Sequence, residues 1–87
     1  MSKKQKLKVR FLRIPAPKDF RWEELETMMD GFGFSFDASG GGSHGHFVKN
    51  DDKDKTIDIS KPHPNGILLS YQIKEIKSKL GEWGLLK

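Results

Sequence analysis

The sequence contains no cysteine among its 87 residues. This absence excludes a disulfide framework, a cysteine-ligated zinc site and a thiol nucleophile. The fold therefore depends on a packed core for its stability, and any catalytic chemistry depends on other side chains.

Long apolar runs are also absent. No segment approaches the roughly 20 apolar residues that span a bilayer, and the basic residues at the start of the chain are not followed by the apolar stretch of a secretory signal. We therefore expect no membrane contact and a cytoplasmic location.

Length and composition set the scale of the fold. An 87-residue chain fits one compact domain with a modest core. Its residues are 34% hydrophobic and 32% charged, with six Phe and two Trp, which is enough apolar material to fold. We expect one two-layer domain without a large substrate cavity.

Positive charge is concentrated at the beginning of the chain. Residues 1–21 contain eight Lys and Arg and a single acid, Asp19, which gives +7, whereas residues 22–87 contain eight Lys and Arg against eleven acids, which gives −3. A cationic end strengthens association with polyphosphates through counterion release, but it carries no sequence specificity.

This composition predicts a basic N-terminal arm over residues 1–18 and a folded domain over residues 19–87. Pro15 and Pro17 favour a stiff linker at the end of the arm. The arm also contains the apolar residues Val9, Phe11, Leu12 and Ile14. Two interpretations therefore stay open: a flexible arm, or an ordered segment that forms a short edge strand or docks on the domain or on a partner.

Hydrophobic periodicity predicts two helices, because apolar residues recur at intervals of three and four in two segments. The first stripe consists of Trp22, Leu25, Met28, Met29 and Phe32. The second stripe consists of Ile73, Ile76, Leu80 and Trp83.

Three segments between these helices alternate apolar and polar residues, as strands do. They cover residues 34–38, 44–49 and 56–60 and are separated by a glycine-rich turn and a polar turn. The predicted fold is α+β, in the order α-β-β-β-α, with two helices on one face of a three-stranded antiparallel sheet. The other face of the sheet is expected to be open.

Residue parity assigns the strand side chains to the two faces. Phe47, Ile57 and Ile59 are predicted to point toward the helices. The residues expected on the open face are His44, His46, Val48, Thr56, Asp58 and Ser60. Two imidazoles and a carboxylate are therefore predicted to share one exposed surface.

Histidine is the side chain that both accepts and donates a proton near neutral pH. Cleavage of RNA by its own 2′-hydroxyl requires such proton transfers and no metal ion. Asp58 is a candidate to orient an imidazole, with an ordinary exposed strand residue as the alternative. For His44 the alternative is likewise a solvated strand residue.

A set of short motifs occurs in order between Asp19 and Leu86. Its elements are an Asp-Phe-x-Trp-x-Glu-Leu opening at residues 19–25, Gly-Ser-His at residues 42–44 with an aromatic three residues later, His-Pro at residues 63–64, and a closing Gly-Leu-Leu. With these motifs the chain resembles the HicA family of messenger-RNA interferase toxins.

The resemblance implies a double-stranded-RNA-binding-domain-like fold, metal-independent endonucleolytic cleavage of mRNA, and inhibition by a HicB-type antitoxin. It also implies that His44 is the catalytic histidine. The chain departs from the family at Gly45, where many members carry a second polar or basic side chain, and in the length of its N-terminal arm.

Further RNA contacts are predicted from exposure and charge on the same elements. The candidates are Gly42, Ser43, His46, Lys74 and Lys77, each with a plain solvated residue as the alternative. His63 lies between two prolines, where a fixed loop conformation and a substrate contact are both open. We expect no cofactor and no metal, because histidines separated by two and seventeen residues match no standard zinc site.

Two other function classes remain open from the residues alone. The first is a non-catalytic RNA-binding module with the same fold. The second is an interaction domain whose open surface serves only a protein partner.

Overall fold

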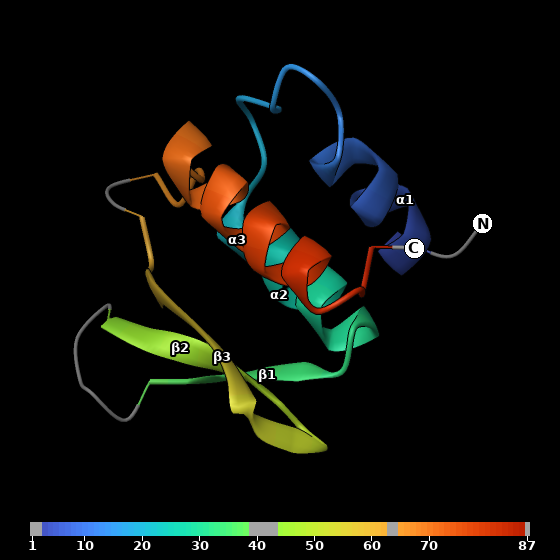
Figure 1. Cartoon of the computed structure of the whole chain (residues 1–87). Helices are drawn as coiled ribbons and strands as arrows, with labels where there is room; N and C mark the ends of the chain where they lie inside the picture. Colours follow the sequence, from blue (N-terminus) through green and yellow to red (C-terminus); the bar gives the residue numbers. More distant parts are fainter. Residues whose placement is uncertain (1–2, 39–43, 63–64, 87) are drawn as a thin grey trace.

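The structure is a computed structural model that describes residues 3–38, 44–62 and 65–86. Its elements are α1 (Lys3–Phe11), α2 (Trp22–Gly31), β1 (Phe34–Asp37), β2 (His44–Lys49), β3 (Asp52–Ser60) and α3 (Ser70–Glu82). The predicted order of helix, three strands and helix is confirmed, and one further helix precedes it (Figure 1). Within the described ranges no helix is long and apolar enough to cross a bilayer.

The three strands form an antiparallel sheet in the order β1-β2-β3. α2 contacts β1 and α3 contacts β3, so the two helices lie over the same face of the sheet (Figure 1). The α+β architecture with one covered and one open sheet face is therefore as predicted.

The core lies between the sheet and these two helices. Phe47, Ile57 and Ile59 are buried there, as parity predicts. Trp22 at the start of α2 packs edge-on against Phe36, with ring centroids 5.0 Å apart. Burial of each large apolar side chain stabilises the fold by roughly 1.5–3 kcal/mol, so this layer holds β1 and β2 against the helices.

The beginning of the chain forms helix α1, and α1 packs on α2. Leu7 and Phe11, one helical turn apart, are both buried, and Phe11 meets Phe20 edge-on at 5.2 Å. The segment thus docks on the domain and is neither a flexible arm nor an edge strand. Two apolar residues in a run of lysines give too weak a periodicity to predict a helix. Their burial results from the packing of α1 on α2, which the local sequence does not indicate.

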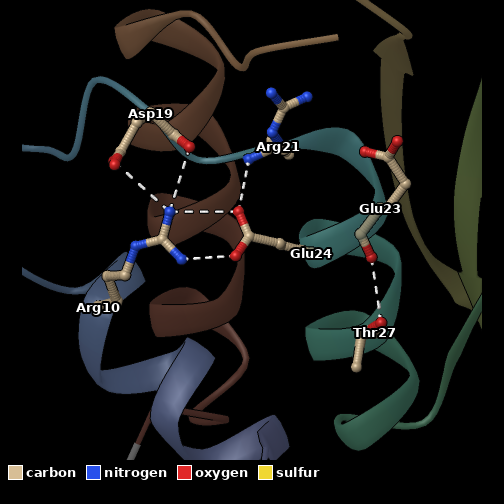
Figure 2. A network of polar contacts seen from close by, with 6 residues as sticks. All are labelled: Arg10, Asp19, Arg21, Glu23, Glu24 and Thr27. Carbon is tan, nitrogen blue, oxygen red and sulfur yellow. Dashed lines mark hydrogen bonds and ion pairs between the residues drawn. The ribbon is translucent and has the colours of Figure 1, made fainter.

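A polar network fixes α1 to the start of α2 (Figure 2). Arg10 donates to both carboxylate oxygens of Glu24, at 2.6 and 3.2 Å, and to the carbonyl of Asp19 at 3.1 Å. Glu24 also accepts the backbone N–H of Arg21 at 3.0 Å. The hydrogen bond from Arg10 holds the pKa of Glu24 below its ordinary value, because it stabilises the ionised carboxylate.

The segments that lead into α2 and α3 are joined by backbone hydrogen bonds. The N–H of Trp22 donates to the carbonyl of Gly66 at 2.8 Å, and the N–H of Leu68 donates to the carbonyl of Phe20 at the same distance. These bonds bring the first turns of both helices side by side.

Candidate active site

Two histidines lie on the open face of the sheet, as parity predicts. In the β2–β3 register His44 is opposite Ser60 and His46 is opposite Asp58. In the β1–β2 register His46 is opposite Asp37. Residues directly opposite one another share a face, so two imidazoles, two carboxylates and the hydroxyl of Ser60 lie on the same open surface.

The ring of His44 is exposed and hydrogen-bonded on one side. Its Nδ1 lies 2.8 Å from the hydroxyl oxygen of Ser60. If Nδ1 carries the proton, it donates to Ser60, and Nε2 keeps a lone pair that faces away from this bond. Such a ring is oriented by the protein and has one nitrogen available to a substrate.

Asp58 lies across the sheet from His46 and not from His44. The hydroxyl of Ser60 contacts the ring of His44 instead. Parity gives the face of a strand residue, whereas the partner across the sheet depends on register, which the sequence does not encode locally.

His46 faces a carboxylate on the neighbouring strand. Its Nε2 lies 3.7 Å from Oδ2 of Asp37, and the imidazole is about 34% exposed. This contact is an ion pair when His46 is protonated. His46 therefore has acidic residues on both sides, Asp37 from β1 and Asp58 from β3.

The buried side chain of Gln72 connects the end of β3 to the first turn of α3. Its Nε2 donates to the carbonyl of Ser60 at 3.0 Å, and its Oε1 accepts the N–H of Leu69, also at 3.0 Å. Both polar atoms of this amide are thus satisfied in a residue that is only 5% exposed. α3 consequently holds the backbone of the serine whose hydroxyl contacts His44.

Gly45 separates the two histidines and points toward the helices. A Cβ at this position would lie 2.5 Å from the carbonyl oxygen of Asp37 and 2.6 Å from the ring of Phe36. No side chain fits there without a shift of β1. Close packing of β1 on β2 therefore accounts for glycine at this position in this chain.

An open groove of about 510 Å³ contains both histidines, and we call it the histidine groove. It is lined by His44, Gly45, His46, Asp58, Ile59, Ser60, Tyr71, Gln72 and Glu75. No Lys or Arg is among the described residues that line it. Cations lie beside it instead: Lys53 lines a hollow that also contains His46, and Lys79 lines another that contains Asp58 and Glu75.

The remaining predicted residues lie away from this groove or outside the described structure. Lys74 is exposed and Lys77 half-buried on α3, and neither lines the histidine groove. Gly42, Ser43 and His63 lie outside the described residues. Within the described ranges, no group of three or more His, Asp or Glu side chains is placed to hold a metal ion.

Sequence reasoning missed the contributions of α3 to the site. Gln72 is buried together with the apolar stripe of α3. A polar residue on the buried side of a predicted helix is the sequence feature that could have indicated its structural role. Tyr71 and Glu75, one turn apart on the adjoining flank, line the histidine groove. Their role depends on where α3 crosses β3, which periodicity does not give.

Comparison with known proteins supports a family assignment. Residues 22–82 match the family described as HicA toxin of bacterial toxin–antitoxin, a span that begins with α2 and ends with α3. The chain has no match among curated proteins or among solved structures in the corresponding searches. Because the match covers more than half of the chain, and because the predicted α-β-β-β-α order is present within it, the chain belongs to the HicA family of toxins from bacterial toxin–antitoxin systems.

Proposed function

We propose that this toxin is a metal-independent endoribonuclease that cleaves mRNA and that His44 transfers the proton in the cleavage step. The observation that carries the proposal is the placement of His44. Its ring is exposed in the histidine groove, oriented through Nδ1 by Ser60, and has Nε2 available.

The reaction uses the 2′-hydroxyl of RNA as the nucleophile. Removal of its proton allows the 2′ oxygen to attack the adjacent phosphorus, and the bond to the 5′ oxygen of the next nucleotide breaks. The products are a 2′,3′-cyclic phosphate and a 5′-hydroxyl. A positioned imidazole supports such proton transfer at neutral pH without a metal ion.

The surroundings of the groove suit a polyanionic chain that passes across the sheet. Lys53 and Lys79 lie in the two hollows that adjoin the histidine groove. Within the described part of the chain neither ammonium group forms an ion pair, so both are available to phosphates. Asp58 and Glu75 inside the groove repel phosphate, so we expect the cations to position the RNA backbone along the margins of the site.

A toxin of this family has an antitoxin partner. We propose that the partner is of the HicB type, that it blocks the histidine groove, and that the toxin acts in the cytoplasm, where mRNA is translated. The groove is open to solvent, which is the geometry that a covering protein requires.

The test is cleavage of a long unstructured RNA by the purified protein in excess chelator, compared with the His44→Ala variant. We expect the wild type to produce 2′,3′-cyclic phosphate ends and the variant to lose activity by about 10²-fold or more. A single 2′-deoxy substitution at a mapped cleavage position is expected to abolish cutting there.

Circular dichroism of the variant separates loss of chemistry from loss of fold. A folded His44→Ala variant that still cleaves RNA would overturn the catalytic assignment. RNA binding by the wild type without cleavage of any substrate would favour the non-catalytic RNA-binding module.

A further inference from the structure

His44 and His46 are two residues apart on β2 and point to the same face of the sheet. Alternate residues of a strand are roughly 7 Å apart along its axis. The intervening residue, Gly45, has no side chain, and both imidazoles line the histidine groove. Two groups capable of proton transfer are thus presented on the same face of one strand.

Cleavage of RNA through the 2′-hydroxyl involves two oxygens on opposite sides of the phosphorus. The attacking 2′ oxygen loses a proton, and the departing 5′ oxygen gains one. In an in-line reaction a single imidazole cannot contact both oxygens well at once, whereas two groups separated by the width of a phosphate can. Two histidines at alternate positions of one strand can supply such a pair of groups.

The neighbours of the two rings differ in a way that assigns the roles. Ser60, a neutral hydroxyl, contacts Nδ1 of His44 at 2.8 Å. Asp37, a carboxylate, lies 3.7 Å from Nε2 of His46, and Asp58 is opposite His46 on the other side. A ring whose second nitrogen keeps a free lone pair can accept a proton, and a ring that faces carboxylates can hold the proton that a general acid donates.

We propose that His46 is a second catalytic residue, the general acid that protonates the leaving 5′ oxygen while His44 acts as the general base. In this step Nε2 of His44 takes the proton of the 2′-hydroxyl, the bond from the 2′ oxygen to phosphorus forms, and the bond from phosphorus to the 5′ oxygen breaks. His46 gives its proton to that oxygen. Exchange with water then returns His44 to its neutral form and His46 to its protonated form.

This inference rests on the proposed RNA cleavage at His44, and the test keeps the two separate. The substrates are an ordinary oligoribonucleotide and the same oligomer with sulfur in place of the bridging 5′ oxygen at the cleaved position. A thiolate departs readily without being protonated, so the sulfur substrate needs a base and no acid. Wild type, His44→Ala and His46→Ala are compared on both substrates.

We expect His46→Ala to cleave ordinary RNA about 10²-fold more slowly than the wild type and to cleave the sulfur substrate at a rate within a few-fold of it. His44→Ala is expected to be deficient on both substrates. Rescue of His46→Ala by sulfur would also demonstrate that the variant is folded and binds RNA.

Two results would overturn the assignment of His46. The first is a His46→Ala variant that cleaves ordinary RNA like the wild type, and the second is an equal deficiency on both substrates, as loss of RNA binding or of structure would give. Wild-type protein that cleaves neither substrate would overturn the proposed ribonuclease function and this inference with it.

Discussion

The hydroxyl oxygen of Ser60 lies 2.8 Å from Nδ1 of His44, across the β2–β3 pair. The backbone of the same serine is held from the other direction, because its carbonyl accepts a hydrogen bond from the buried amide of Gln72 at 3.0 Å. The orientation of an exposed imidazole is thereby tied to the packed interface between β3 and α3.

Replacement of Ser60 by alanine is expected to slow RNA cleavage about tenfold. A hydrogen bond of this kind contributes roughly 0.5–1.5 kcal/mol, and about 1.4 kcal/mol corresponds to a factor of ten in rate. The loss should fall on kcat and leave KM nearly unchanged, and Ser60→Thr should retain activity. Single-turnover kinetics give the rate of the chemical step directly.

Ser70→Ala provides the matched control, because this serine begins α3 and its side chain is exposed. Equal activity of Ser60→Ala and Ser70→Ala would show that Ser60 does not position His44.

Replacement of Gly45 by alanine is expected to lower the free energy of unfolding by about 1–3 kcal/mol, as overpacking does. The new Cβ would lie 2.5 Å from the backbone oxygen of Asp37, and a backbone atom cannot rotate away as a side chain can. β1 would have to move off β2, which also removes Asp37 from His46. Urea unfolding measures the change in stability.

Gly81→Ala is the control for the loss of a glycine. Among the described residues, a Cβ at Gly81 would meet Leu86 alone, at an ordinary 3.8 Å. Alanine in a helix is favoured over glycine by roughly 0.8–1 kcal/mol. We therefore expect the two substitutions to change stability in opposite directions. A stable Gly45→Ala variant would contradict the packing argument.

Much of the fold could be predicted because its signals are local. The stripes around Trp22 and Ile73 and the alternation around Phe47 define helices and strands by period alone, and parity places His44 and His46 on the open face. The partner of His44 could not be predicted, because a shift of register by two residues preserves the faces and exchanges the partners.

The contributions of α1 and α3 depend on tertiary packing. Phe11 is buried against Phe20, and Gln72 is buried where α3 meets the end of β3. A local pattern can place a residue on the buried side of a helix, but it does not show which element that helix packs on. The glycine-rich turn and His63 lie outside the described residues, and their predicted contacts remain predictions.

Lysines beside the active site should contribute more to RNA binding than lysines on the far flank of α3. Lys53 and Lys79 line hollows that adjoin the histidine groove, whereas Lys74 and Lys77 line neither that groove nor those hollows. The double variant Lys53→Ala/Lys79→Ala removes the same charge as Lys74→Ala/Lys77→Ala.

We expect the first double variant to bind single-stranded RNA more weakly than the second and to have a shallower salt dependence of binding. Each lost phosphate contact should reduce the slope of log K against log salt concentration by about 0.7. Fluorescence anisotropy with the His44→Ala background measures binding without cleavage. The same slope for both double variants would mean that the RNA path is not confined to the margins of the groove.

The ion pair between Arg10 and Glu24 makes the attachment of α1 dependent on pH. The hydrogen bond from Arg10 lowers the pKa of Glu24 in the folded protein below its ordinary value of 4.5. Glu24 therefore contributes stability that is fully present above about pH 4.5 and is lost as the pH falls through the pKa of the folded state. Glu24→Gln should lower the free energy of unfolding at pH 7 by about 1–3 kcal/mol.

Glu23→Gln removes the same charge from the same helical turn, but the Glu23 side chain is exposed and lies outside the Arg10 contacts (Figure 2). We expect its stability to stay close to that of the wild type, because both substitutions weaken the interaction with the helix dipole equally and only one breaks the ion pair. As the pH falls from 4.5 through the lowered pKa of Glu24 in the folded protein, the wild type and Glu24→Gln should converge in denaturant unfolding, since protonation of Glu24 removes the charge that the substitution removes. A stability difference between them that persists unchanged at pH 3 would mean that the charge of Glu24 does not hold α1 in place.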